Sequence, residues 1–267
     1  MKYACAIQII QATIKKNIVY KFSHLSTVTG ILFSMFIQLF LWKALLPEGA
    51  TYQNNGEISF STMTAYVFIS SLLQILTTSY LLDNTSSKIR KGDIVFNLLR
   101  PRGLFFITLC ESIGEGAYKL LFIVVPIGCL FGILFDIHLP DATSLLLFII
   151  SIINAFFLVF ILEYLVSLAG FWIVQTHSLG VFFWSIFSLL SGAMVPIWFF
   201  PDWLQGLASC LPFNFVYFFP ISVFTGEIDI ATCCQGVVAQ IAWIAVLSLL
   251  AHFVFKRGLR KIVIFGG

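Results

Sequence analysis

Long apolar stretches recur along this sequence and constrain it more than any other feature. A helix needs about 20 mainly apolar residues to cross the hydrocarbon core of a bilayer. Stretches of this kind lie at 23–45, 61–82, 105–134, 142–174, 179–199 and 236–256. Of the 267 residues, 60% are hydrophobic and only 10% are charged, which is outside the range of soluble domains. We therefore predict an all-α integral membrane protein with six transmembrane helices.

The lengths of these stretches favour helices over strands. Each is far longer than the roughly 10-residue alternating segments of an outer-membrane barrel. A helix also closes its backbone hydrogen bonds internally, as lipid requires. The sequence contains no soluble domain and no repeat of fixed period, so we interpret residues 1–267 as a single membrane domain.

The basic residues predict which side of the membrane each loop faces. Lys and Arg accumulate on the cytoplasmic side of spans. Thirteen of the 15 cations fall before the first stretch, between the second and third, or after the last. The opposite loops carry acidic residues without Lys or Arg: Glu48, Glu57, Asp136, Asp141, Asp202, Glu227 and Asp229. We expect a multi-pass protein of a bacterial plasma membrane with both termini in the cytoplasm.

Residues 1–21 differ from the spans that follow. Ile7, Ile10, Ile14 and Ile18 recur at helical spacing, while polar residues lie between them. This pattern is typical of a helix lying along the inner membrane surface. The alternative is that these residues simply begin the first span.

The cytoplasmic segment 84–104 is too apolar for an idle loop. Ser86 or Ser87 predicts the start of a short helix, Gly92 its end, and Asp93 the start of a second one before Pro101. Apolar residues in the second half predict packing against membrane helices or a partner. The alternative is an ordinary basic loop.

The segment 191–226 is apolar and aromatic but contains four prolines. No straight helix can pass through Pro196, Pro201, Pro212 and Pro220. We predict that residues 200–226 enter the membrane from outside and turn back as a re-entrant helical hairpin. The alternative is an aromatic external loop resting on the bilayer.

Both segments resemble the permeases of the ABC type-2 exporter family, and the resemblance covers almost the whole chain. After the second span the family carries a Gly-acidic pattern followed by Leu-Leu-Arg-Pro, matched by Gly92, Asp93, Leu98, Leu99, Arg100 and Pro101. After the fifth span the order of residues also fits: Gly192, Pro196, Pro201, Trp203, Leu204, Leu211, Pro212, Pro220 and Gly226.

The resemblance implies roles for these residues. Segment 84–104 would contain the coupling helix that docks on an ATP-binding subunit, with Lys88 and Arg90 beside the matched residues. The N-terminal helix would lie alongside it. The residues implied in the outer gate are Gly192, Pro196, Pro201, Trp203, Pro212 and Pro220.

The chain lacks the Gly-x-x-x-x-Gly-Lys-Ser/Thr loop that binds ATP phosphates. We therefore expect no cofactor in this chain, and ATP and magnesium on a partner ATPase. A second permease, identical or related, would complete the unit, which would export an amphipathic or hydrophobic compound such as a drug, lipid or peptide. The alternatives are an ion-coupled secondary transporter and a membrane-embedded lipid-modifying enzyme.

Some charged residues fall inside predicted spans, where a charge is costly. Counting inward from the outer ends places Glu115, Lys119 and Glu163 in the inner leaflet. Lys119 can pair with Glu163 across the third and fourth spans, or with Glu115 one turn back on its own helix. Alternatively, Lys119 snorkels and Glu163 is hydrated. The outer cysteines, Cys210, Cys233 and Cys234, leave a disulfide and free thiols as equal alternatives.

Overall fold

A computed structural model describes residues 2–46, 60–95, 103–134, 140–173 and 175–265, and this part of the chain is helical with no strand. Five helical stretches in it are long and apolar enough to cross a membrane: His24–Leu45, Thr62–Arg90, Leu104–Ile133, Ala142–Phe171 and Ile230–Lys261. A further apolar helix, Thr176–Leu190, is shorter. The all-helical membrane class is confirmed, and this shorter helix overlaps the fifth predicted span, 179–199.

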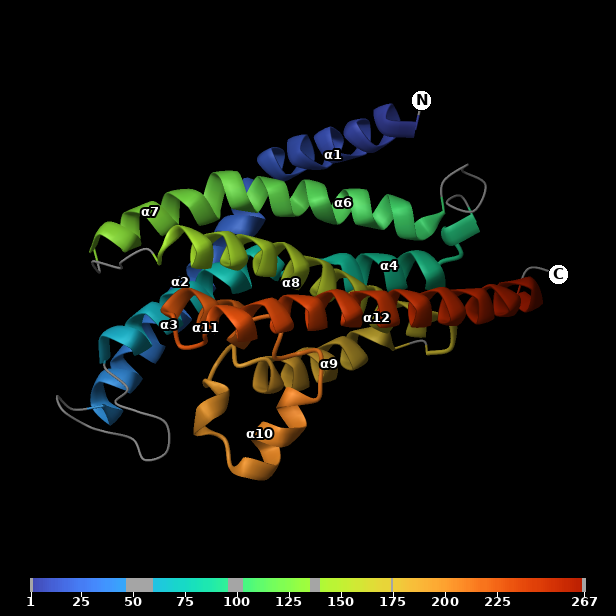
Figure 1. The fold of residues 1–267 in the computed structure, drawn as a ribbon. Helices are drawn as coiled ribbons and strands as arrows, with labels where there is room; N and C mark the ends of the chain where they lie inside the picture. Colours follow the sequence, from blue (N-terminus) through green and yellow to red (C-terminus); the bar gives the residue numbers. More distant parts are fainter. Residues whose placement is uncertain (1, 47–59, 96–102, 135–139, 174, 266–267) are drawn as a thin grey trace.

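The long helices run side by side as a bundle (Figure 1). Its members are α2 (Lys21–Leu45), α3 (Phe60–Thr77), α6 (Leu104–Lys119) with its continuation α7 (Val125–Leu134), α8 (Ala142–Leu168) and α12 (Ile230–Phe265). A π-helical turn, Leu120–Val124, joins α6 to α7. The start of α1 and the last turns of α12 lie at the same end of the bundle in Figure 1.

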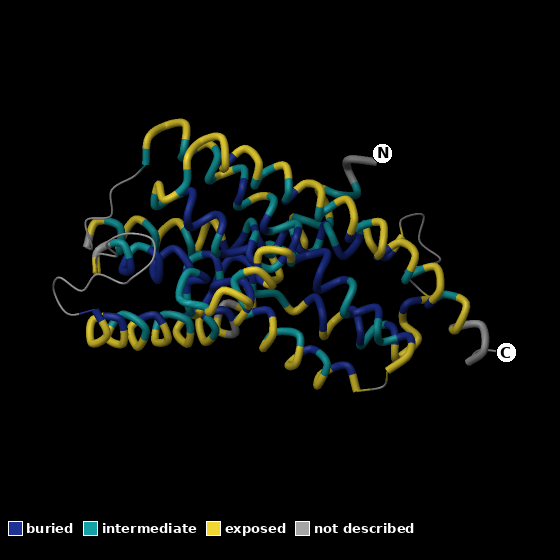
Figure 2. Tube along the Cα trace, turned by 60° about the horizontal axis from the view of Figure 1, so that its bottom comes forward, coloured by how far each residue is buried: buried dark blue, intermediate teal, exposed yellow. Residues whose placement is uncertain are grey.

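The outside of the bundle is apolar. Large side chains such as Phe33, Ile133 and Phe253 are exposed. The buried parts of the chain, in dark blue, occupy the middle of the bundle in Figure 2. Tyr66 and Leu158 are among the fully buried side chains. A surface of this kind suits lipid as the surrounding solvent.

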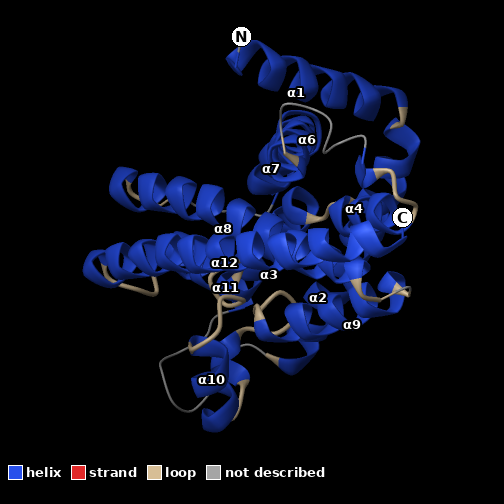
Figure 3. Ribbon diagram, turned by 90° about the vertical axis from the view of Figure 1, so that its right-hand side faces the viewer, coloured by secondary structure: helices blue, strands red, loops and turns tan. Residues whose placement is uncertain are grey.

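Helix α1 (Lys2–Val19) is separate from α2 and crosses α6 obliquely (Figure 3). A Cβ at Gly114 of α6 would lie 2.9 Å from the Ile10 carbonyl oxygen and 2.9 Å from the Thr13 Cβ, so glycine permits this close approach. Of the predicted isoleucine stripe, Ile7 and Ile18 are exposed and do not pack against the bundle. A small residue on α6, rather than the apolar pattern of α1, decides which face of α1 packs.

The second predicted span, 61–82, is broken. Helix α3 ends at Thr77, residues 78–80 are not helical, and α4 (Leu81–Arg90) continues the segment. Ser86 and Ser87 lie inside α4 rather than capping it, which corrects the predicted start of that helix. Its predicted end holds, because the chain turns at Gly92, whose φ is +78°.

The predicted span 179–199 is also too long. Helix α9 ends at Leu190, and a left-handed Gly192 (φ +78°) follows. Beyond it lie a 3₁₀ turn (Ile197–Phe199), α10 (Asp202–Ser209) and α11 (Phe218–Thr225). The predicted span 142–174 likewise leaves the α-helix at Leu168 and ends in a 3₁₀ turn, Ala169–Phe171. Helix α10 projects from the side of the bundle in Figures 1 and 3.

The six cysteines, all within the described residues, are free thiols. The alternative of a disulfide among Cys210, Cys233 and Cys234 is therefore not realised in this structure.

Candidate functional site

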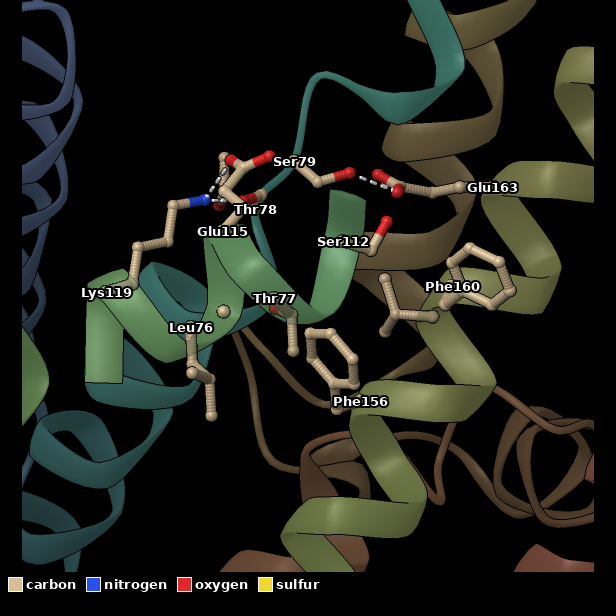
Figure 4. Close-up of a pocket in the computed structure, with 12 residues that line it drawn as sticks. Leu76, Thr77, Thr78, Ser79, Ser112, Glu115, Lys119, Phe156, Phe160 and Glu163 are labelled. Atoms are coloured by element: carbon tan, nitrogen blue, oxygen red, sulfur yellow. Dashed lines mark hydrogen bonds and ion pairs between the residues drawn. The ribbon is translucent and has the colours of Figure 1, made fainter. Parts of the chain in front are cut away.

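Two buried charged side chains, one from α6 and one from α8, contact the break between α3 and α4 (Figure 4). The Lys119 amine of α6 donates to the carbonyl oxygen of Thr78, and the Glu163 carboxylate of α8 accepts from the Ser79 hydroxyl. Lys119 is 4% exposed and Glu163 is 1% exposed. A helix that ends frees its last carbonyls, and Lys119 satisfies one of them. Both charges thus bind adjacent residues of the broken segment.

Lys119 also forms an ion pair within its own helix. Its Nζ lies 2.7 Å from a Glu115 carboxylate oxygen, one turn back on α6. The alternative pair between Lys119 and Glu163 across the two spans is not formed, which corrects that hypothesis. The broken segment lies between the two side chains: its Thr78 carbonyl is the partner of Lys119, and its Ser79 hydroxyl is the partner of Glu163.

The polar contacts extend from this break to the irregular segment before α11. The Thr77 Oγ1 lies 2.6 Å from the Tyr217 hydroxyl, which belongs to the turn before α11. A cavity of about 10 Å³, lined by Thr77, Ser112, Glu115 and Glu163 among others, lies within this group. That volume is about the size of one water molecule.

Local chemistry explains why the helix ends here. Thr77 and Thr78 direct their hydroxyls to the carbonyls of Leu73 and Gln74, at 2.9 and 2.7 Å. Such bonds back to the preceding turn compete with helix continuation and bend helices. The run Thr77-Thr78-Ser79 therefore favours a break inside an otherwise apolar span.

A second break, after α9, is held by neutral side chains of α3. The Tyr66 hydroxyl donates to the Gly192 carbonyl at 2.6 Å, and the Ser70 hydroxyl donates to the Ala193 carbonyl at 2.8 Å. Tyr66 and Ser70 are one helical turn apart and so face the same partner. At Gly192 a Cβ would lie 2.9 Å from the Tyr66 hydroxyl and 3.0 Å from the Phe218 Cβ, so this turn requires glycine.

Gln240 of α12 secures the end of the same irregular segment. Its Nε2 donates to the carbonyls of Phe215 (2.9 Å) and Ser151 (3.1 Å), and its Oε1 accepts from the Asn154 side chain at 3.3 Å. Gln240 is fully buried. Sequence reasoning missed this residue, although an amide inside the predicted span 236–256 was a usable signal. Freed backbone carbonyls at membrane depth need such partners.

The prolines predicted in the outer gate mostly mark helix starts. Pro201 immediately precedes α10, Pro220 lies in the first turn of α11, and Pro196 precedes the 3₁₀ turn. Proline is tolerated at these positions because the first N–H groups of a helix have no partner inside it. Pro212 is buried in the turn between α10 and α11, whereas Trp203 points outward and is 71% exposed.

The residues predicted to couple to an ATPase lie at the end of α4 and just beyond it. Lys88 pairs with Glu111 of α6 at 3.4 Å, and Arg90 and Asp93 are exposed. Ile94 is completely buried and anchors the chain after the Gly92 turn. The remaining predicted residues, Leu98, Leu99, Arg100 and Pro101, lie outside the described residues.

The described part of the chain holds no group of three His, Cys, Asp or Glu side chains able to bind a metal ion. The apolar exterior and the long apolar helices are those of a polytopic membrane protein.

The family follows from comparison with known proteins. Residues 32–266 match the family described as ABC-2 family transporter protein, so the chain belongs to this family of membrane transport components. Members associate with an ATP-binding cassette ATPase and generally have no ATPase site of their own. Comparison with curated proteins and with solved structures gave no match.

Proposed function

We propose that this chain is the membrane-spanning permease subunit of an ATP-driven exporter. The working unit would contain two permeases, identical or related, and two ATP-binding cassette subunits. ATP and magnesium would bind to those subunits and supply the free energy, while this chain forms the path for the exported compound. Family membership supports the class of protein, and helix α4 supports the mode of coupling.

Helix α4 is the observation on which the proposal chiefly rests. One end of α4 carries exposed basic residues and the Gly92–Asp93 turn, and the other end is the break held by Lys119 and Glu163. A rigid helix can transmit displacement between two sites when its ends have alternative arrangements. Docking of an ATPase against residues 88–95 would thus act on the interior of the membrane domain.

Within this proposal the remaining helices take up the predicted topology. Helix α9 with the turn that follows forms the fifth crossing and α12 the sixth, and both termini face the cytoplasm of a bacterial plasma membrane. Helices α10 and α11 form the re-entrant outer region, with the prolines as helix starts. The bonds from Tyr66, Ser70 and Gln240 support irregular backbone within the membrane.

A cavity between α4 and α9 supports an amphipathic substrate. Its volume is about 370 Å³, within the usual range for small-molecule sites. Hydroxyls of Ser185 and Ser188 line it together with Trp184 and Val181. Such a mixed lining suits a compound with both apolar and polar parts, whether a drug, a lipid or a peptide.

The proposal is tested by assembly and transport. The chain is co-expressed with a cassette ATPase, and Asp93→Lys and Gly92→Pro are each expected to abolish stoichiometric co-purification or ATP-dependent transport in proteoliposomes. Asp202→Lys is the matched control, because it makes the same charge change at an exposed position in α10. Coupling through this segment is excluded if both variants assemble and transport like the parent.

An ion-coupled secondary transporter is the second candidate. The buried set of Glu115, Lys119 and Glu163 favours it, since intramembrane charges commonly serve ion pathways. The same proteoliposomes decide between the two candidates. Uptake driven by an imposed proton or sodium gradient without ATP would favour the secondary transporter.

A further inference from the structure

A cavity lined by several polar side chains lies between α1, α4 and α6, and it is far larger than a packing gap. Its volume is about 660 Å³. Helix α1 lines it with Lys16 and Asn17, while α4 and α6 contribute several polar side chains, among them Lys88 and Glu111. This cavity shares Ser112 and Glu115 with the small cavity at the break described above.

The carboxylates that line this cavity are already engaged or at its rim. Glu111 lies 3.4 Å from the Lys88 amine, and Glu115 lies 2.7 Å from the Lys119 amine. Asp83 keeps 61% of its side chain exposed to solvent. The acidic groups therefore leave little uncompensated negative charge inside.

The hydrogen-bond donors on α1, Asn17 and Lys16, are by contrast not compensated. Asn17 is only 7% exposed, and its Oδ1 accepts from the His24 Nε2 at 3.3 Å, which directs the amide nitrogen away from His24. That nitrogen, Nδ2, has no hydrogen-bond partner in the structure. The neighbouring Lys16 has no ion-pair partner among the described residues. A buried amide donor left unpaired costs about 1–3 kcal/mol, so this arrangement favours an acceptor-bearing anion.

The depth of the cavity points to the source of that anion. About 20 residues cross the hydrocarbon core, so a span with its outer end near Leu134 leaves the core at roughly residue 114. The cavity is lined by α6 from Ile107 to Glu115, which is the level of the inner headgroups. The chain beside the two donors exposes apolar Ile18, Val19 and Leu25, as expected for contact with acyl chains.

We propose that this cavity binds the phosphate of an inner-leaflet phospholipid through the Lys16 ammonium and the Asn17 amide. The inference rests on the topology proposed above, though it needs no ATPase. A lipid held there would fasten α1 to α4 and α6. The phosphate group is common to phospholipids and to soluble phosphate esters, so the experiment includes both.

The chain offers a matched pair of lysines for the test. Lys15 and Lys16 are both exposed neighbours on α1, and only Lys16 lines the cavity. Binding of short-chain phosphatidylglycerol to the purified chain is measured by native mass spectrometry. Lys16→Ala is expected to weaken binding about tenfold, the loss of one charge-assisted hydrogen bond, whereas Lys15→Ala leaves it unchanged.

Three further outcomes would overturn the proposal. The first is equal weakening by Lys15→Ala and Lys16→Ala, or weakening by neither. The second is equally tight binding of a diacylglycerol with the same chains, which lacks the phosphate. The third is Lys16-dependent binding of glycerol 3-phosphate as tight as that of the lipid, which would identify a soluble phosphate ester as the ligand. None of these results depends on transport, so they leave the proposed function to its own test.

Discussion

The two breaks in this helical bundle are held in different ways. At the break after α3, charged side chains bind the backbone segment: Lys119 donates to Thr78, and Glu163 accepts from Ser79. At the break after α9, neutral Tyr66 and Ser70 donate to backbone carbonyls, and Gln240 does the same further along. Both arrangements satisfy freed backbone groups inside the membrane.

The difference lies in what happens when a contact is lost. Removing one neutral donor leaves a carbonyl without a partner, whereas removing Lys119 also leaves the Glu115 carboxylate without its counter-charge. The charged break is therefore the more expensive one to disturb. It also adjoins α4, the helix that we propose to move, while the neutral break fixes an outer segment in place.

Lys119→Met should have the largest effect, because it leaves the Glu115 carboxylate and the Thr78 carbonyl unpaired. We expect a loss of about 3–5 kcal/mol in the free energy of unfolding. The double variant Lys119→Met/Glu115→Gln should lose less than the single variant. Thermal unfolding of the purified chain measures both, with Lys15→Met as an exposed control. Equal losses in the single and double variants would contradict a charge-dependent break.

Gly192→Ala should come next and tests the neutral break. Alanine must adopt φ near +78° and lies against the Tyr66 hydroxyl, so we expect a loss of about 1–3 kcal/mol. Gly206→Ala in α10 is the control, since a Cβ there meets no atom within 4 Å. If both glycines tolerate alanine equally in thermal unfolding, the close contact with Tyr66 does not exist.

Gln240→Leu removes two donated hydrogen bonds but leaves no charge behind. We expect a loss of about 1–3 kcal/mol, below that of Lys119→Met. Hydrogen exchange in the turn near Phe215 should also increase. A loss as large as that of Lys119→Met would remove the distinction between charged and neutral breaks.

Substitution of Asp141, which we place outside the membrane, should have the smallest effect on stability and serves as the reference for the two breaks. Its carboxylate caps α8 by accepting from the Ser144 backbone N–H at 3.4 Å, and the hydrogen bonds from Ser144 lower the pKa of this carboxyl. A lowered pKa means that the contribution to stability is present above the ordinary pKa and is lost as the pH falls through the lowered value.

The measurement is the difference in melting temperature between the parent chain and Asp141→Ala. We expect a small difference at pH 7 that shrinks as the solution is acidified below the ordinary aspartate pKa of about 3.9. A difference that is independent of pH would mean that the carboxylate charge plays no part in the cap.

The sequence by itself determined the solvent and the class of fold. Apolar stretches such as 142–174 are too long and too uniform to fold in water, so the helices and the membrane follow from composition and length alone. The turn at Gly92 was also predictable, because it depends on a local backbone preference. The family resemblance, carried by motifs from 92 to 226, agrees with the match over 32–266.

Only the tertiary structure decided where the helices break and which side chains meet. The end of α3 at Thr77 was hidden, because a hydropathy average over a whole span does not locate a short run of hydroxyl side chains. The partners of Lys119 and Glu163 depend on that break, so the cross-span pair could not be distinguished from the pair with Glu115. Likewise, the face of α1 that packs depends on a glycine in another helix. Local sequence sets helical periodicity, whereas contacts between distant segments depend on which backbone groups are freed and how closely two helices can approach.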